Sequence, residues 1–376
     1  MSEKKREAVV AGQVCLDLMP VFRTKETNHI EEILIPSSTV YVGKADIHAG
    51  GCVTNTGLAM KIFGTDVCLM AKVADDDFGK IILRQYGERV STENMIVSKG
   101  DEGTSYSMVI APAGIDRIFL HCPGVNDNFD EDDLDYDLIG TAKLFHFGYP
   151  QAMRRMYING GKELSDVFRR VKERDVTTSM DTSGLDPNSE AGKTDWREIL
   201  QKVIPDIDIF VPSVEELCYM MDRDKFDEWT ARANGKGIGS FIRREDVAPL
   251  AEELLSWGAK VLMIKCGAAG MYFAVNGKKE LEKTGSDLRP LLTGWADTEH
   301  FEHSFRPKKI LSATGAGDTC IAAFLTAMLR GYGWEKCLMY ASATGAACLE
   351  AYDSLSGLLS FEELDKRIRD GWEKNT

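Results

Sequence analysis

A loop that carries two glycines runs straight into an apolar helix late in the sequence, and this pairing constrains the fold more than any other feature. Residues 312–319 read Ser-Ala-Thr-Gly-Ala-Gly-Asp-Thr, and the glycines at 315 and 317 let the backbone turn tightly. The apolar residues that follow recur at helical spacing on one face: Ile321, Phe324, Leu325, Met328 and Leu329. Such a loop presents free N–H groups and the positive end of a helix dipole, which together suit a phosphate group.

One acidic residue, Asp318, occupies the same place in the sequence. A carboxylate beside a phosphate site repels the ligand unless it has a task, such as accepting the proton of a hydroxyl that attacks phosphorus. The alternative is that Asp318 is the N-cap of the helix and that the glycines form only a turn. The local pattern supports both interpretations equally.

The order of apolar runs predicts an α/β fold. Residues 8–18 are expected to form a first buried strand, and from about residue 132 short apolar runs alternate with segments of helix length. These runs cover residues 144–147, 176–180, 207–211 and 261–264. The alternation predicts a mainly parallel sheet covered by helices.

Three other stretches do not follow this alternation. A hairpin is predicted over residues 104–111 and 117–122, around a Pro-Ala-Gly turn. Residues 222–246 are charged and contain glycines, and residues 280–307 are irregular around Trp295. We interpret both of these as insertions at the surface.

The charge and cysteine content exclude several classes of protein. Lys and Arg number 45 against 59 Asp and Glu, and the net charge of −14 argues against a nucleic-acid or anionic-membrane binder. The nine cysteines form no Cys-x-x-Cys pair, as expected for reduced thiols. No run approaches the roughly 18 apolar residues of a membrane span. We therefore expect a cytoplasmic protein that does not bind membranes.

The segment Thr314-Gly315-Ala316-Gly317-Asp318 resembles the C-terminal signature of the PfkB (ribokinase-like) family of sugar and nucleoside kinases. The resemblance implies a ribokinase-like three-layer α/β sandwich with a central, mostly parallel sheet, in one domain over residues 1–376. It also implies a small β lid from about residues 20–48 and 100–121. In this family the aspartate is the catalytic base, and amides at the positions of Gly315, Ala316 and Gly317 form an anion hole.

Motifs on the acceptor side extend the resemblance. Asp17 matches the family aspartate that binds sugar hydroxyls, and Gly50-Gly51 with Asn55 resembles the signature GGxxxN, which helps to hold the acceptor. The plainer interpretations are a turn-forming aspartate and a glycine turn before a helix, with Asn55 exposed on its first turn. Cys52 stands where some members carry lysine.

Motifs on the nucleotide side follow in the family order. Ser213 to Glu216 resembles NxxE with serine in place of asparagine, and the resemblance implies that Glu216 organises magnesium through water. In the family, a strand and a turn lie along the nucleotide, and Lys265, Gly267 and Gly270 resemble that segment. Threonine is commoner in the family at the position of Lys265. Ser342 falls near the adenine pocket, or it only packs between helices. Ser312 replaces an aspartate that commonly binds a monovalent cation, which makes such a cation doubtful.

The resemblance implies transfer of a phosphoryl group from ATP–Mg²⁺ to a primary hydroxyl of a sugar. The alternatives are a purine nucleoside kinase of the same family and a non-catalytic nucleotide-binding regulator. A sugar phosphate would need Lys or Arg beside the acceptor, and the acceptor positions are neutral or acidic. We therefore predict an unphosphorylated acceptor, with Lys44 and Arg117 as the cations that could reach in from the lid. The lid also offers an edge or face for a homodimer.

Overall fold

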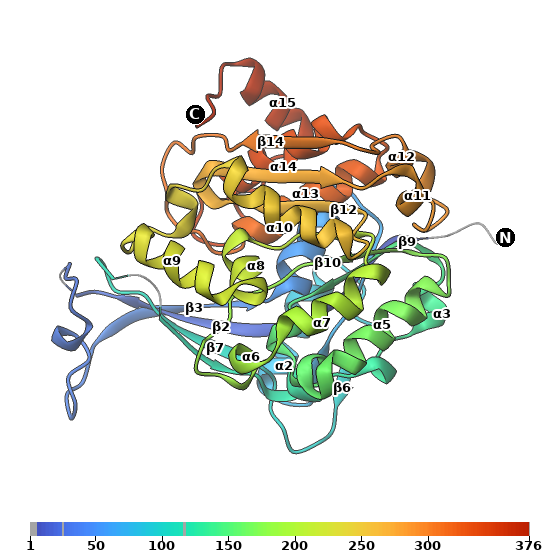
Figure 1. Ribbon diagram of the computed structural model, residues 1–376. Coiled ribbons are helices and arrows are strands. Elements are labelled where there is room, and N and C mark those ends of the chain that lie inside the picture. The colour runs from blue at the N-terminus through green and yellow to red at the C-terminus, as the bar shows by residue number, and fades with distance from the viewer. Residues whose placement is uncertain (1–5, 25, 116–117, 376) are drawn as a thin grey trace.

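The computed structural model describes residues 6–24, 26–115 and 118–375. Two sheets organise this part of the chain: a large sheet between two layers of helices, and a small sheet that projects from it (Figure 1). The expected three-layer α/β architecture is confirmed.

The large sheet has eight strands in the order β14-β13-β12-β11-β10-β9-β1-β4. Its strands are β1 (Arg6–Gly12), β4 (Val67–Met70), β9 (Ala142–Gly148), β10 (Thr177–Met180), β11 (Ile209–Phe210), β12 (Val261–Lys265), β13 (Gly270–Val275) and β14 (Glu299–His303). All pairs from β12 to β4 are parallel, and β13 and β14 add two antiparallel pairs at one edge. The four apolar runs after residue 132 are therefore strands, as predicted.

Helices cover both faces of this sheet because its strands are apolar on both faces. Val10 and Met263 point into one core, whereas Val9 and Leu262 point into the other. The first core is covered by α1 (Leu58–Ile62), α2 (Asp77–Gly87), α13 (Ala316–Leu329), α14 (Trp334–Cys348) and α15 (Phe361–Arg369). The second is covered by α3 (Tyr136–Ile139), α4 (Arg154–Tyr157), α5 (Lys162–Lys172), α7 (Trp196–Val203), α8 (Val214–Met221), α9 (Arg223–Ala233) and α10 (Arg244–Ser256).

The small sheet has the order β3-β2-β7-β8. Its strands are β2 (Cys15–Phe22), β3 (Val42–Gly50), β7 (Tyr106–Ile110) and β8 (Ile118–Cys122). The antiparallel pair β7–β8 is the predicted hairpin. A further parallel pair joins β5 (Lys72–Ala74) to β6 (Ile96–Ser98).

The prediction of one strand over residues 8–18 is wrong, because this segment forms two strands, β1 and β2, that belong to different sheets. Gly12 has φ +128°, and a Cβ atom there would lie 2.3 Å from the carbonyl oxygen of Gly148. The chain turns at this close contact, so the residues after it leave the large sheet and pair with β3 and β7. Asp17 therefore lies within a strand of the small sheet.

The two segments interpreted as surface insertions also contribute to the core. Residues 222–246 form α9, a short 3-10 turn and the first residues of α10, and they bury Trp229 and Ile242. Residues 280–307 contain α12 (Arg289–Thr293) and the edge strand β14, and they bury Leu292 and Trp295 in the core. The buried apolar residues of both segments are scattered among charged residues, so the sequence shows no apolar run there.

Two expectations from composition can be compared with the structure. All nine cysteines are free, and eight of them are buried. Within the described ranges, no helix is both long and apolar enough to cross a membrane.

Candidate active site

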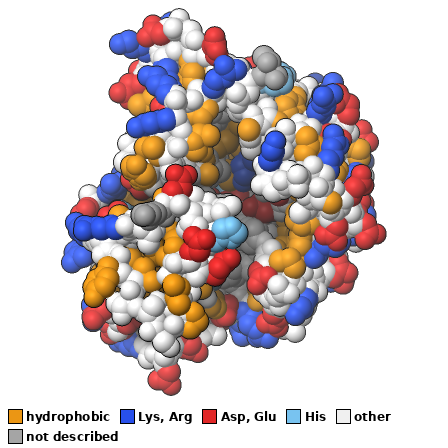
Figure 2. All heavy atoms as spheres, turned by 90° about the vertical axis from the view of Figure 1, so that its left-hand side faces the viewer, with side chains coloured by type: hydrophobic (Ala, Val, Ile, Leu, Met, Phe, Trp, Pro, Cys, Tyr) orange, Lys and Arg blue, Asp and Glu red, His pale blue; other side chains and the backbone are white. Residues whose placement is uncertain are grey.

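Several of the predicted site residues lie at the carboxyl ends of the parallel strands, among them Ser213 after β11 and Lys265 at the end of β12. From β1 the chain continues to β4 on one side and later returns to β9 on the other, so the strand order reverses at this point. In open α/β sheets, ligands bind outside the carboxyl ends of the strands at such a reversal. Figure 2 shows the molecule hollowed on the side from which the small sheet projects, with acidic side chains and a histidine beside the hollow.

Asp318 lies in the first turn of α13, and it is not the N-cap. The N-cap is Gly315, whose φ of +72° suits glycine and whose missing Cβ leaves room for the side chain of Ser354. Asp318 is 5 % exposed, and its carboxylate accepts hydrogen bonds from side chains of two other segments. The N-cap interpretation of Asp318 is therefore wrong.

Two donors hold the Asp318 carboxylate. Asn55 Nδ2 donates to Oδ2 at 2.8 Å, and the Tyr149 hydroxyl donates to Oδ1 at 2.6 Å. Asn55 is buried, and its Oδ1 accepts from Ser354 Oγ at 2.8 Å, so both ends of its amide are used inside the protein. Burial raises the pKa of Asp318, and the hydrogen bonds from Tyr149 and Asn55 oppose that rise.

The interpretation of Asn55 as an exposed residue on a helix turn is thus wrong. It lies in a short π-helical segment, Val53–Gly57, immediately before α1. Such segments often occur at functional sites. Here the segment brings the amide of Asn55 to a carboxylate 263 residues later in the sequence.

One cation lies beside the glycine loop. Lys265 ends β12, and its Nζ donates to the carbonyl oxygen of Val211 at 2.6 Å. A Cβ atom added to Gly317 would lie 3.5 Å from Cε of Lys265, so the lysine side chain passes directly along the start of α13. The positions of Gly315, Ala316 and Gly317 therefore combine a helix N-terminus with a nearby ammonium group, which suits an anion.

Two residues of this cluster were not predicted from the sequence. Tyr149 follows β9 and has φ +61°, an uncommon conformation for a bulky residue. Asp181 follows β10 and accepts from the Tyr149 amide at 3.2 Å. Burial raises the pKa of Asp181 far above its usual range, and the charge of Asp318 adds to the effect. Their position directly after two parallel strands is the signal that could have identified them.

The acceptor side shows a polar row across the small sheet. Asp17 pairs with His48 on β3 and with Ser107 on β7, and Ser107 pairs with His121 on β8. Ser107 Oγ and His121 Nδ1 are 3.0 Å apart. Residues paired across strands share a face, so these four side chains lie on one face. Burial raises the pKa of Asp17, while hydrogen bonds from Cys15 and Ser107 oppose it.

The glycine pair Gly50-Gly51 packs against this row. A Cβ atom at Gly50 would lie 2.2 Å from Oδ2 of Asp17, and one at Gly51 would lie 2.1 Å from Oε1 of Gln13. Gly51 also has φ +87°. Side chains at these positions would therefore displace polar groups of the site, which explains why glycine is needed there.

On the nucleotide side, Glu216 completes a helix cap. Ser213 is the N-cap of α8, and Glu216 Oε2 accepts from the Ser213 amide at 3.0 Å and from Thr182 Oγ1 at 2.6 Å. The Ser-x-x-Glu spacing is thus a capping box that also brings a carboxylate near Asp181.

The other predicted residues on this side shape the backbone. Gly267 and Gly270 flank the turn between β12 and β13, and both have positive φ. Ser342 lies in α14, where its Oγ donates to the carbonyl oxygen of His303 at 3.1 Å and accepts from the Phe305 amide. Ser342 therefore ties α14 to the segment after β14.

Of the two cations that could meet a phosphorylated acceptor, the structure describes only Lys44. Lys44 lies on β3 and is exposed. Arg117 lies outside the described residues. Ser312, at the doubtful cation position, accepts from the Thr314 amide at 3.1 Å.

Known proteins share this fold and this sequence pattern. Residues 11–359 match the sequence profile of the family described as "pfkB family carbohydrate kinase". An uncharacterized sugar kinase of Archaeoglobus fulgidus is 24 % identical over 80 % of this chain and 98 % of its own. The 5-dehydro-2-deoxygluconokinase of Geobacillus kaustophilus is 21 % identical over 98 % and 96 %.

A solved structure shows the same fold. Arabidopsis thaliana ribokinase, complexed with ribose and ATP, superposes with a TM-score of 0.68 at 18 % identity and covers 96 % of this chain and 98 % of its own. A family match over nearly the whole length, the glycine loop at α13 and the shared fold agree: this chain belongs to the pfkB family of carbohydrate kinases.

Proposed function

We propose that the protein transfers a phosphoryl group from ATP to a primary hydroxyl of an unphosphorylated sugar or sugar-like acceptor. The observation that carries this proposal is the buried carboxylate of Asp318 at the start of α13, held by Asn55 and Tyr149 beside the glycine loop. A carboxylate at a phosphate site has a clear use as a general base.

Asp318 is suited to take the proton from the acceptor. Each carboxylate oxygen accepts one hydrogen bond from the protein, which leaves lone pairs for a substrate hydroxyl. The proton of the hydroxyl passes to Asp318 as its oxygen bonds to phosphorus and the bond to the ADP oxygen breaks. Asn55 and Tyr149 keep the carboxylate in place, so we assign Asn55 a positioning role rather than the direct acceptor contact that the motif suggests.

The nucleotide would lie between the glycine loop and β12. Bound ATP supplies the phosphoryl group, and Mg²⁺ neutralises part of the phosphate charge. Gly315, Ala316, Gly317 and Lys265 would face the transferring group, and Glu216 would orient magnesium through water. The turn at Gly267 and Gly270 would lie along the nucleotide, with Ser342 near the base. An Escherichia coli relative of the same fold contains ATP and Mg²⁺, which supports this assignment.

The small sheet would act as a lid over the acceptor. Its polar row carries Asp17, His48 and Ser107 on one face, where hydroxyl groups of an acceptor can be bound. Closure of such a lid excludes water, which would otherwise accept the phosphoryl group. The described cations near Asp17 do not include a buried Lys or Arg, so the row favours a neutral or weakly acidic acceptor over a sugar phosphate.

The opposite face of the lid suits a second copy of the chain. Ile47, Met108 and Leu120 pair through Leu18 in a row across the sheet, and they are 40 %, 38 % and 55 % exposed. An exposed apolar row of this kind is typical of an interface. We therefore propose a homodimer through the lid, in the cytoplasm.

The deciding experiment is an acceptor screen with ADP release as the readout. Free sugars, sugar acids, nucleosides and sugar phosphates are compared at saturating ATP–Mg²⁺. The proposal expects acceptor-dependent ADP release with an unphosphorylated sugar or sugar acid. A preference for purine nucleosides would favour the nucleoside kinase, and ATP binding without any acceptor-dependent turnover would favour a non-catalytic regulator.

A further inference from the structure

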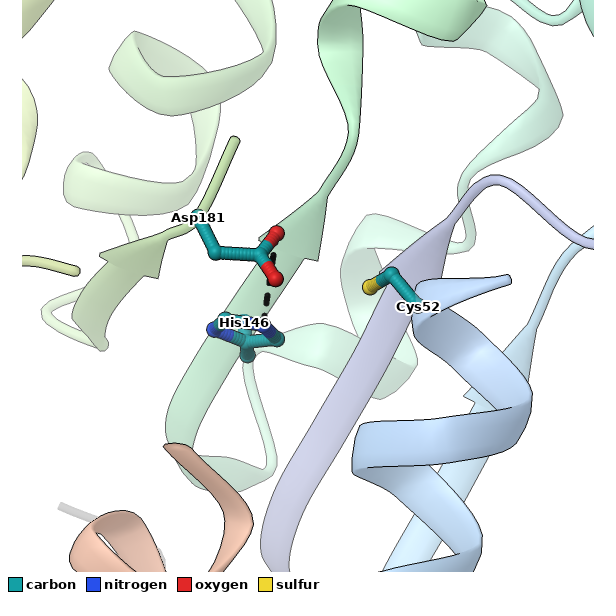
Figure 3. A group of neighbouring side chains, drawn as sticks. All are labelled: Cys52, His146 and Asp181. Atoms are coloured by element: carbon teal, nitrogen blue, oxygen red, sulfur yellow. Dashed lines mark ion pairs between the residues drawn. The ribbon is translucent and has the colours of Figure 1, made fainter. Parts of the chain in front are cut away.

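Three buried side chains of the kinds that bind metal ions lie close to one another and to Asp318. Cys52, His146 and Asp181 each offer a ligand atom, and these atoms lie within 4.8 Å of one another. All three side chains are fully buried. Figure 3 shows the His146 ring and the Asp181 carboxylate facing each other, with the sulfur of Cys52 directed toward them from the start of the neighbouring helical segment.

The polar atoms of this group are not satisfied within the protein. Nε2 of His146 and Oδ2 of Asp181 are buried without a hydrogen-bond partner. The distance from His146 Nε2 to Asp181 Oδ1 is 3.9 Å, too long for a hydrogen bond. Buried polar atoms normally find partners, and two unpaired atoms beside one thiol indicate a missing ligand.

The approach of two of these ligands depends on a glycine. A Cβ atom at Gly148 would lie 1.6 Å from Sγ of Cys52 and 2.8 Å from Oδ1 of Asp181. The sulfur and the carboxylate therefore approach each other only because residue 148 is glycine. A tetrahedral zinc ion with bonds of about 2.0–2.3 Å separates its ligand atoms by roughly 3.3–3.8 Å, so these side chains would close by about 1.5 Å at most.

The hydrogen bonds that the proposed ligands make with other residues also fit a metal site. His146 Nδ1 lies 3.0 Å from Ser179 Oγ. When Nδ1 donates to that hydroxyl, the lone pair is on Nε2, which faces the group. Asp181 is fixed in turn by the amide of Tyr149.

We propose that Cys52, His146 and Asp181 bind a divalent cation of the zinc class, in addition to the magnesium of the kinase reaction. Thiolate and imidazole ligands suit zinc, whereas magnesium prefers oxygen ligands alone. On binding, the Cys52 thiol and the Asp181 carboxyl group lose their protons to solvent, and the sulfur, Nε2 and a carboxylate oxygen each donate an electron pair to the ion. Three protein ligands leave the fourth position open.

The position of the ion links it to the catalytic centre. Tyr149 donates its amide N–H to Asp181 and its hydroxyl to Asp318, so one residue contacts both carboxylates. A cation at Asp181 would thus be one residue away from the proposed base, a link that rests on the proposed function.

The test is a titration of the whole, reduced, metal-stripped protein with Co²⁺, which reports on its ligands by colour. We expect one equivalent to bind with a thiolate-to-cobalt charge-transfer band and the visible bands of a tetrahedral site, and Zn²⁺ to displace it. Cys52→Ser should remove the charge-transfer band. The matched control is Cys68→Ser, another buried thiol, which should keep it.

A second variant and a second measurement guard against unfolding. His146→Gln keeps a polar side chain and should weaken Co²⁺ binding by about 100-fold or more, since even outer-shell changes cost about 10–100-fold. Zn²⁺ should raise the melting temperature of the parent and of Cys68→Ser, but not of His146→Gln. A parent protein without the charge-transfer band would overturn the proposal. So would a band that persists in Cys52→Ser, or unchanged affinity in His146→Gln.

Discussion

The Tyr149 hydroxyl donates a hydrogen bond of 2.6 Å to the carboxylate of Asp318, which lies 169 residues later in the sequence. Tyr149 adopts φ +61°, and the same residue donates its amide N–H to Asp181. A bulky residue in this conformation costs of order 1–3 kcal/mol and persists only where its surroundings hold it. The strained tyrosine thus joins the proposed base to a second buried carboxylate.

The first prediction concerns Asp318 itself. If Asp318 is the base, Asp318→Asn should lower kcat by about 100-fold or more, because the amide cannot take the hydroxyl proton. Binding of ATP, measured by calorimetry, should change little. The control is Glu335→Gln, which alters an exposed acid in the first turn of the neighbouring helix α14. Unchanged turnover in Asp318→Asn would remove the general base from the mechanism.

The second prediction concerns the pH dependence of kcat. Because burial raises the pKa of Asp318, activity should rise with pH through a range above that of an ordinary aspartate. Tyr149→Phe removes a hydrogen bond that lowers this pKa, so the acid limb should move to higher pH and kcat should fall by about tenfold. The measurement is a pH–rate profile of both proteins. An acid limb that stays in place would mean that Tyr149 only fills space.

The third prediction concerns Lys265. Its ammonium group lies along the first turn of α13, so Lys265→Met should reduce kcat/KM for ATP by about 10- to 100-fold, in line with loss of one charged hydrogen bond. Lys366→Met, at an exposed position on α15, is the control. Affinity for ADP should fall less than affinity for ATP, because the lysine would face the phosphate that only ATP has. Equal losses for both nucleotides would place Lys265 elsewhere along the nucleotide.

The sequence predicts the large sheet well because its strands are buried on both faces and read as continuous apolar runs. It predicts Asp318 because a carboxylate is conspicuous beside two glycines. The sequence does not reveal that the first strand ends at Gly12. The strand ends there because Gly12 lies in close contact with Gly148, which is far away in the sequence. Local patterns cannot report such a contact.

The same limit applies to the site. Asn55 is recognisable in its motif, but its bonds to Asp318 and Ser354 depend on three distant segments meeting. Tyr149 and Asp181 belong to no motif considered, and only their positions at the ends of neighbouring parallel strands bring them together. Fold class follows from periodicity, whereas the contacts of the site follow from topology.

The fourth prediction concerns the proposed dimer. Leu120 is 55 % exposed in the apolar row of the small sheet, and Leu120→Asp would place a charge in the interface. We expect the parent to sediment as a dimer at micromolar concentration and Leu120→Asp to sediment as a monomer. Ile62→Asp, at a residue 45 % exposed on α1, should leave the dimer intact. A monomeric parent would contradict the proposal.

The last prediction separates stability from catalysis. Asp208 is fully buried directly before β11, at the amino ends of the strands, opposite the site. Lys172 Nζ donates to both of its carboxylate oxygens, at 2.9 and 2.8 Å, and the ammonium group of buried Lys260 lies 3.9 Å away. The Thr178 amide donates to the same carboxylate at 3.0 Å.

Asp208→Asn would leave both ammonium groups without their counter-ion, and breaking a buried pair in this way costs about 3–5 kcal/mol. Urea unfolding should show this loss, while kcat at a temperature well below unfolding should stay unchanged. Glu198→Gln breaks the exposed pair with Lys202, an i,i+4 contact of 2.6 Å, and should cost only about 0.3–0.5 kcal/mol. If Asp208→Asn were as stable as Glu198→Gln, the buried cluster would not contribute to folding. If it lowered kcat in the folded protein, the two ends of the sheet would be coupled.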